Sequence, residues 1–140
     1  MTRASGANWG LLLLRVGLAS LLIGLHGGPR LARALRYFVD GEPWTFVGLV
    51  EGLGLPFPLV FALLSTAADS LCAFLAGLGF LTRWAAAVMA INMAVAVRFE
   101  ATGGDSFELP ALYLLGALVL VVAGAGAYSL DGRRSRGSLR

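Results

Sequence analysis

Hydrophobic residues along this chain fall into four long segments, which are separated by stretches that hold most of the charged side chains. The segments cover about residues 9–28, 58–80, 83–99 and 108–127. The hydrocarbon core of a bilayer is roughly 30 Å thick, and about 20 helical residues cross it. Each segment is therefore long enough, or nearly so, to span a membrane once. The ionisable residues inside them are chiefly Arg15, His26 and Asp69.

The composition supports a membrane protein. Of 140 residues, 58% are hydrophobic and 14% are charged, which leaves too little polar surface for a water-soluble domain of this size. We predict an all-α integral membrane four-helix bundle, with one domain over residues 1–131 and a basic tail over residues 132–140. The first segment resembles the apolar part of a signal peptide, but Arg15 inside it and the Gly-Gly-Pro-Arg sequence after it argue against cleavage.

The arginines predict the orientation, because cytoplasmic loops are enriched in Lys and Arg. An even number of crossings puts both termini on one side, together with Arg3, Arg83, Arg133, Arg134, Arg136 and Arg140. The other side holds Arg30, Arg33, Arg36 and Arg98. We therefore predict a multi-pass protein of a bacterial or archaeal plasma membrane, with both termini in the cytoplasm.

The longest connection, residues 29–57, is expected on the outer side. Its apolar residues between Pro43 and Val50 predict a short helix at the membrane interface, and Gly52, Gly54 and Pro56 break that helix. This connection is either a lid folded over the bundle or a linker that rests on lipid headgroups.

Asp69 is the most deeply placed ionisable residue, about halfway along the second segment. A charge there costs roughly 2.5–3.5 kcal/mol or more unless it is paired or hydrated. Small residues share its helical stripe, so a neighbouring helix can approach closely and Asp69 faces the bundle interior. Arg15 is the expected partner, with its Cα roughly 8 Å nearer the cytoplasm at 1.5 Å per residue. In the alternative interpretation, Arg15 reaches the inner headgroups and Asp69 is neutral.

His26 follows Arg15 by 11 residues, which places both on one face of the first helix. Near its outer end we expect a polar mouth that includes Arg98, Glu100 and Glu108. His26 either bonds a ligand carbonyl and relays protons, or is a hydrogen-bonding residue at a helix end. Asn92 is expected to form an interhelical hydrogen bond as packing support.

Side-chain counts limit the cofactors. One histidine cannot provide bis-His haem ligation, and one cysteine, Cys72, cannot form an intramolecular disulfide or a CxxC centre. No haem, metal site or disulfide centre is expected, and no nucleic acid is expected as a partner. The expected partners are the lipid bilayer and either other subunits of a membrane complex or further copies of this chain.

Five sequence features resemble the DoxX family of small four-helix membrane proteins. They are Arg15, His26-Gly27, Asp69, the turn Gly79-Phe80-Leu81-Thr82-Arg83-Trp84-Ala85-Ala86, and the closing motif Gly124-Ala125-Gly126-Ala127-Tyr128-Ser129-Leu130-Asp131. The resemblance covers about residues 10–131. It implies structural roles for Arg83, Ser129 and Asp131.

The chain departs from the family pattern at two positions. The family usually has Glu at the position of Asp69 and often has Lys at the position of Arg30, so both charges are kept.

The resemblance implies association with membrane oxidoreductase complexes of the thiosulfate:quinone or thiol and oxidative-stress type. Our leading hypothesis is a quinone-interacting or membrane-anchoring subunit. A menaquinone or ubiquinone would lie near Asp69, His26 and Arg15, and Arg30, Arg98 and Glu108 would contact the substrate. The alternatives are a non-catalytic scaffold, whose basic tail recruits an enzyme or binds anionic lipid, and a small oligomeric transporter.

Overall fold

The computed structural model describes residues 3–137, and all regular structure within that range is helical. The helices are α1 (Arg3–Leu22), η1 (Ile23–Gly27), α2 (Gly28–Val39), α3 (Thr45–Glu51), α4 (Pro58–Ala67), η2 (Ala68–Cys72), α5 (Ala73–Leu78), α6 (Thr82–Gly103), α7 (Glu108–Ala123) and α8 (Leu130–Gly137). Two of them, η1 and η2, are single π-helical turns set inside longer helices.

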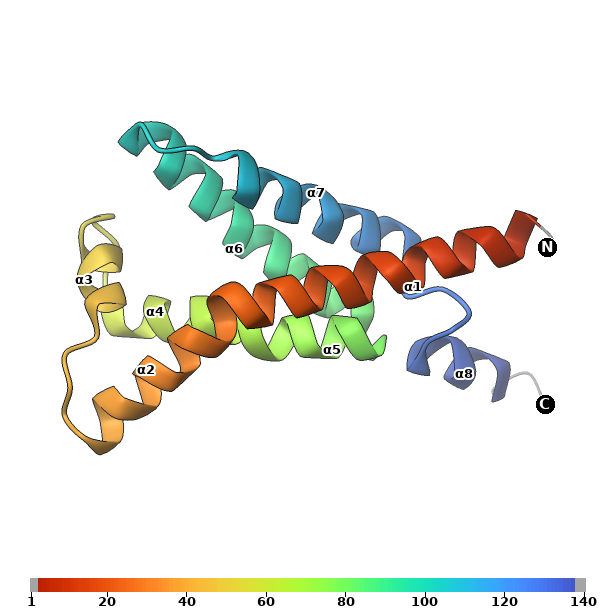
Figure 1. Ribbon diagram of the computed structural model, residues 1–140, viewed down its shortest axis with the longest axis horizontal. Helices are drawn as coiled ribbons and strands as arrows, with labels where there is room; N and C mark the ends of the chain where they lie inside the picture. The colour runs from red at the N-terminus through yellow and green to blue at the C-terminus, as the bar shows by residue number, and fades with distance from the viewer. Residues whose placement is uncertain (1–2, 138–140) are drawn as a thin grey trace.

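The chain folds as a bundle of long helices (Figure 1). In the first span, α1, η1 and α2 run on without a break, and in the second span α4, η2 and α5 do the same. Helices α6 and α7 pack along each other, and α1 packs against α5. Both chain ends lie at the end of the bundle that carries the turn after α5, which we call the termini end. The opposite end, which carries α3, is the loop end.

Three helical stretches of the described residues are long and apolar enough to cross a membrane: Ser5–Val39, Pro58–Leu78 and Thr82–Gly103. The apolar helix Glu108–Ala123 has 16 residues and returns along α6 to the termini end. The chain is therefore an all-α, multi-pass membrane protein, and the predicted fold class is confirmed. The cytoplasmic location of the termini stays a prediction from the arginine count.

The first span is longer than predicted. We expected the helix to end near residue 28 and a loop to follow, but the helix continues to Val39. Pro29 lacks an N–H group and would normally break a helix. Here it occupies the first turn of α2, directly after η1, where the Gly28 N–H bonds the Ile23 carbonyl five residues back. The π-turn therefore lets the helix pass through Gly27, Gly28 and Pro29.

The predicted short helix between the first two spans is present as α3, which packs on α4. Its N-cap, Trp44, is only 4% exposed. Together α2, α3 and α4 form a small apolar core at the loop end, made of Ala34, Trp44, Val50 and Ala62. The segment therefore packs as part of the protein, which favours the lid interpretation over a linker resting on lipid.

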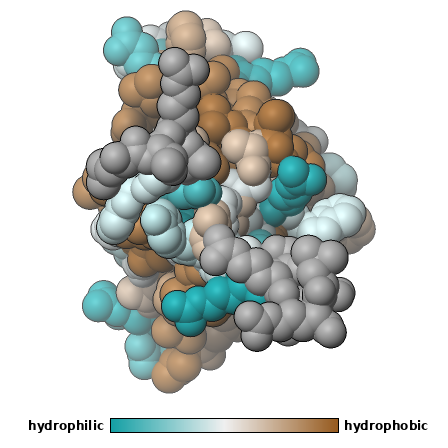
Figure 2. Space-filling view, turned by 90° about the vertical axis from the view of Figure 1, so that its right-hand side faces the viewer, coloured by the Kyte–Doolittle hydropathy of each residue, from teal (hydrophilic) through white to brown (hydrophobic). Residues whose placement is uncertain are grey.

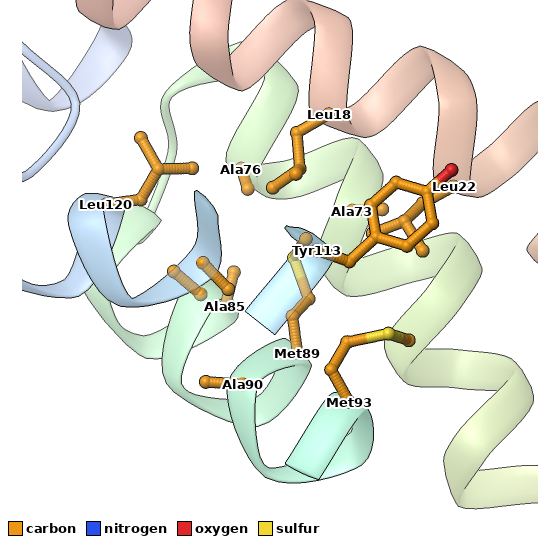
Figure 3. Close-up of a cluster of buried hydrophobic side chains, with 12 residues drawn as sticks. Leu18, Leu22, Ala73, Ala76, Ala85, Met89, Ala90, Met93, Tyr113 and Leu120 are labelled. Atoms are coloured by element: carbon orange, nitrogen blue, oxygen red, sulfur yellow. The ribbon is translucent and has the colours of Figure 1, made fainter. Parts of the chain in front are cut away.

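The main core lies between α1, α5, α6 and α7 (Figure 3). Small residues dominate it on the side of α5 and α6, where Ala73, Ala76 and Ala86 are fully buried. Leu18, Leu22, Met89 and Leu120 fill the space between the helices. Because the small side chains allow close approach, dispersion contacts stabilise the packing in a membrane.

A segment after α7, residues 124–132, closes the termini end, and we call it the C-terminal clasp. Arg15 is 2% exposed, and its guanidinium donates to the carbonyl oxygens of Ala125, at 3.0 Å, and of Tyr128. Asn8 Oδ1 accepts a bond from the Ala127 N–H at 2.8 Å. The first helix is thereby joined to the last part of the chain, and hydrophilic groups gather among the apolar ones at this end (Figure 2).

Asp131 joins the clasp to the turn before α6. Its two carboxylate oxygens accept the Leu81 and Thr82 N–H groups, at 3.0 and 2.9 Å, and its own N–H donates to the Gly79 carbonyl. A carboxylate at these positions satisfies N–H groups that a helix start leaves without intrahelical partners. Ser129 Oγ accepts the Gly132 N–H and donates to the Gly126 carbonyl. The closing motif is therefore a set of hydrogen bonds that holds the bundle together.

Replacing Arg15 by Met should lower stability by about 2–4 kcal/mol, because buried carbonyl oxygens then lose their donor. The measurement is thermal unfolding in mild detergent. The matched control is Arg83→Met: Arg83 is exposed and donates one bond of 3.3 Å to the Val122 carbonyl. We expect less than about 1 kcal/mol for this control. Equal losses in both variants would contradict a structural role for Arg15.

Candidate ligand-binding site toward the loop end

The site is built around Asp69, whose side chain is completely buried at the middle of the second span. Both carboxylate oxygens have donors. Arg30 Nη1 from α2 lies 2.6 Å from Oδ2, and Asn92 Nδ2 from α6 lies 2.9 Å from Oδ1. The interior position of Asp69 and the interhelical bond of Asn92 are as predicted. The charge is paired and hydrogen-bonded, as a carboxylate in an apolar interior requires.

The predicted pairing of Arg15 with Asp69 is wrong. Asp69 packs beside Gly27, whereas Arg15 lies beside Gly79 at the termini end. Twelve residues separate Gly27 from Arg15, which is about 18 Å along a helix rather than the expected 8 Å. Arg15 also bonds the clasp instead of reaching headgroups, so the alternative interpretation of Arg15 fails as well. The partner of Asp69 is Arg30.

The two π-turns meet at this point. A Cβ atom on Gly27 would collide with the backbone carbonyl of Asp69 and lie 2.8 Å from the Ser70 nitrogen. Only glycine permits this approach of η1 to η2. Single π-turns are frequent at functional sites. The close contact of η1 with η2 fixes the position of α2 relative to the second span, and therefore places Arg30 within reach of Asp69.

Hydroxyl groups satisfy the backbone around η2. Ser70 Oγ donates to the Thr66 carbonyl at 2.6 Å, and Thr66 Oγ1 donates to the Ala62 carbonyl at 2.8 Å. A π-turn displaces carbonyl oxygens from their usual partners, and serine and threonine side chains can replace those bonds within a membrane. The irregular turn that carries Asp69 is thus supported locally by its own helix.

The α3 segment covers the other side of Arg30. The Arg30 guanidinium carbon lies 4.2 Å from the centre of the Phe46 ring, within the range of a cation–π contact. Arg30 therefore lies between an aromatic ring and a carboxylate. Phe46 appeared in the sequence only as one apolar residue of the predicted short helix, and its contact with a charge was not expected.

A cavity of about 180 Å³ opens beside this ion pair. Its polar lining consists of His26, Arg30, Asp69, Glu100, Ser106 and Tyr113, and its apolar lining consists of Leu22, Met93, Leu109 and Pro110. His26 and Tyr113 meet edge to face, with ring centres 5.8 Å apart. Five buried side-chain polar atoms of the described residues have no hydrogen-bond partner, and two of them, His26 Nδ1 and the Tyr113 hydroxyl, belong to this lining. The other three are Arg15 Nε, Trp44 Nε1 and Thr82 Oγ1.

The cavity includes some of the predicted site residues and leaves out others. His26, Asp69 and Arg30 line it together, and so does Glu100 of the expected mouth. Arg98 and Glu108 are exposed and lie outside its lining, and Arg15 is in the clasp. Tyr113 was missed, although a phenol within an otherwise apolar helix was a visible signal. Figure 3 shows its ring beside Leu22, with the hydroxyl pointing away from the core alanines.

A double-mutant cycle should show which arginine is coupled to Asp69. We expect a coupling energy of about 1–3 kcal/mol between Arg30→Met and Asp69→Asn, because the two side chains share a hydrogen-bonded ion pair. Arg15→Met and Asp69→Asn should be additive within about 0.5 kcal/mol, since these residues have no shared partner. Thermal unfolding in detergent gives both values. If the stability losses of Arg30→Met and Asp69→Asn are additive, the ion pair does not contribute to the stability of the protein.

Gly27→Ala should lower stability by about 1–3 kcal/mol, because the new methyl group overlaps the Asp69 backbone. Gly24→Ala is the matched control in the same π-turn: a Cβ atom there meets nothing within 4 Å. We expect no loss for Gly24→Ala in the same unfolding measurement. If Gly27→Ala and Gly24→Ala lose the same amount of stability, the close contact between η1 and η2 does not explain the glycine at position 27.

A comparison with protein families identifies the family of this chain. The family model for DoxX matches residues 10–102, which include the first two spans, Asp69 and Asn92. No curated protein and no solved structure matches the chain. The matched region ends before the clasp, whose motif also resembles the family. Because the family model matches about two thirds of its length, the chain belongs to the DoxX family.

Proposed function

We propose that this protein is a quinone-binding membrane subunit of an oxidoreductase complex. One observation carries the proposal: a partly apolar cavity in the membrane-spanning bundle holds two buried polar atoms without partners, His26 Nδ1 and the Tyr113 hydroxyl. Buried polar groups normally have hydrogen-bond partners. A ligand that bonds both groups would satisfy them, and a quinone head group has two carbonyl oxygens for this purpose.

The size of the cavity fits one ring. A protein cavity of about 150 Å³ can hold benzene. At about 180 Å³, this cavity has room for a substituted six-membered ring. Leu22, Met93 and Leu109 would contact the faces and edges of such a ring. A lipid-soluble molecule would reach the bundle from the bilayer itself.

The charges of the lining favour a neutral ligand. The lining contains one arginine and two acidic residues, Asp69 and Glu100, and the charge of Arg30 is already paired with Asp69. A dianion such as thiosulfate would meet a negative balance in a medium of low dielectric constant. Of the four arginines expected on that side, Arg30 alone lines the cavity, so no convergent cationic site supports thiosulfate here.

The residues divide the chemistry between them. A quinone, when bound, accepts two electrons and two protons, and the electrons would come from a partner subunit. An imidazole such as that of His26 can hydrogen-bond a carbonyl oxygen and relay a proton, and the Tyr113 hydroxyl is suited to donate a hydrogen bond to a carbonyl oxygen. Asp69 has both oxygens engaged, so its role is to hold Arg30 and Asn92 in place as a fixed charge.

The same engagement of Asp69 favours the second candidate function, a scaffold. In a scaffold the Arg30–Asp69 pair would only fix the positions of α2, the second span and α6. The two functions differ in what they require of His26 and Tyr113. A scaffold needs neither group, whereas a quinone site needs both.

Protein purified in mild detergent should carry quinone in near-stoichiometric amount, measured by extraction and redox difference absorbance. Tyr113→Phe should weaken binding about 3-fold to 10-fold, because one hydrogen bond contributes roughly 0.5–1.5 kcal/mol. His26→Ala should weaken it further, since its polar group and its packing are both lost. Tyr128→Phe is the matched control: this ring contacts Trp9 at the termini end, with ring centres 5.2 Å apart.

Each variant is first shown to be folded by its thermal unfolding. Quinone at background level in the unmodified protein, or a content unchanged by His26→Ala, would overturn the quinone proposal and leave the scaffold. Loss of quinone in Tyr128→Phe to the same extent as in Tyr113→Phe would show that binding is not located in this cavity.

A further inference from the structure

Helix α2 has three distinct flanks, and two of them are exposed. Arg30, Ala34 and Tyr37 face the protein, where Ala34 is buried in the core of the loop end. At 100° per residue, a second flank carries exposed apolar side chains. These are Leu31, Leu35, Phe38 and Val39, which are 45%, 58%, 60% and 78% exposed. The third flank carries the exposed Arg33 and Arg36.

The position of α2 along the membrane normal follows from its packing against α4. Ala34 of α2 and Ala62 of α4 belong to one apolar cluster, and α4 begins at Pro58. Because the first and second spans run in opposite directions, Arg36 lies close to the level at which the second span begins. That span has 21 residues and is about 31 Å long, which equals the hydrocarbon thickness. Arg36 is therefore at the headgroup boundary, and Arg33 is one turn deeper.

Neither arginine has a partner within the part of the chain that the structure describes. Arg30 is held by Asp69 and Phe46, but no ion pair or hydrogen bond involves the guanidinium of Arg33 or Arg36. The nearest acidic residue along the helix, Asp40, lies one turn beyond Arg36 at the end of α2 and forms no ion pair with it. The guanidinium groups of Arg33 and Arg36 are thus available to an anionic group from outside the chain at the membrane boundary.

We propose that α2 binds the phosphate groups of anionic phospholipids in the leaflet at the loop end. The apolar flank would contact acyl chains and hold the helix at a fixed depth, as in interfacial amphipathic helices. Arg33 and Arg36 would extend to the headgroups, because arginine side chains can reach the interface from one turn below it. The guanidinium fork suits phosphate oxygens. This inference does not depend on quinone binding.

The test uses the full chain in vesicles, with Trp44 as the reporter. Trp44 lies beside Tyr37 of α2, with ring centres 6.3 Å apart. The other two tryptophans are at the termini end, Trp9 beside Tyr128 of the clasp and Trp84 in the first turn of α6. In a Trp9→Phe/Trp84→Phe background, quenching by brominated phosphatidylglycerol is compared with quenching by brominated phosphatidylcholine. The ratio of the two gives the relative affinity for the anionic lipid.

We expect a clear preference for phosphatidylglycerol, and Arg33→Gln/Arg36→Gln should reduce it by up to about 30-fold. Each arginine near an anionic surface contributes about 1 kcal/mol, and two give about 2 kcal/mol. Arg98→Gln is the matched control, since Arg98 is exposed near the same end on α6 and should keep the preference. Thermal unfolding confirms that each variant is folded.

Three results would overturn the proposal. They are equal affinity for the two lipids in the unmodified protein, an unchanged preference in the double variant, and an equal loss in Arg98→Gln. After either of the first two results, the remaining candidate for the anion that binds Arg33 and Arg36 is an acidic segment of a partner protein. The third would show an effect of total charge rather than of α2.

Discussion

A carboxylate at the middle of a membrane-spanning helix sets the constraint on which this structure depends. Asp69 is fully buried, and its charge is tolerated because Arg30 and Asn92 donate to its two oxygens. For Arg30 to reach it, the first span has to stay helical beyond Pro29 and pass close to the second span. The bare backbone of Gly27 and the two π-turns make that approach possible. The cavity lies where these elements meet.

Much of the fold was predictable from the sequence. Apolar segments of membrane length identify helices directly, because no other element satisfies its backbone in lipid except a closed barrel. The short helix α3 followed from an apolar run ended by glycines and proline. The inward position of Asp69 followed from the cost of exposing a carboxylate to lipid, and the bond of Asn92 followed from its place within an apolar helix.

The sequence predicted which face of a helix points inward, but it did not predict at which level along the bundle axis two helices meet. The wrong pairing of Arg15 arose from this. Arg15 and His26 both face the interior, as their spacing predicted, but periodicity does not say at which level one helix meets the next. The antiparallel packing puts Gly27 beside Asp69 and therefore moves Arg15 to the termini end. The sequence also contained no local sign that η1 would carry the helix through Pro29. Tyr113 was overlooked because its partner, His26, comes from a segment almost ninety residues earlier.

The clasp has a consequence for how the protein is made. Arg15 lies in α1, whereas the carbonyl oxygens that it bonds belong to Ala125 and Tyr128, more than 100 residues later in the sequence. Until translation has delivered residues 124–132, the guanidinium lacks its native acceptors, and an unpaired arginine is unfavourable in lipid. Burial of Arg15 against its native acceptors is therefore possible only after the three further spans have been added. Closure of the termini end thus depends on residues 124–132, which follow all four spans in the sequence.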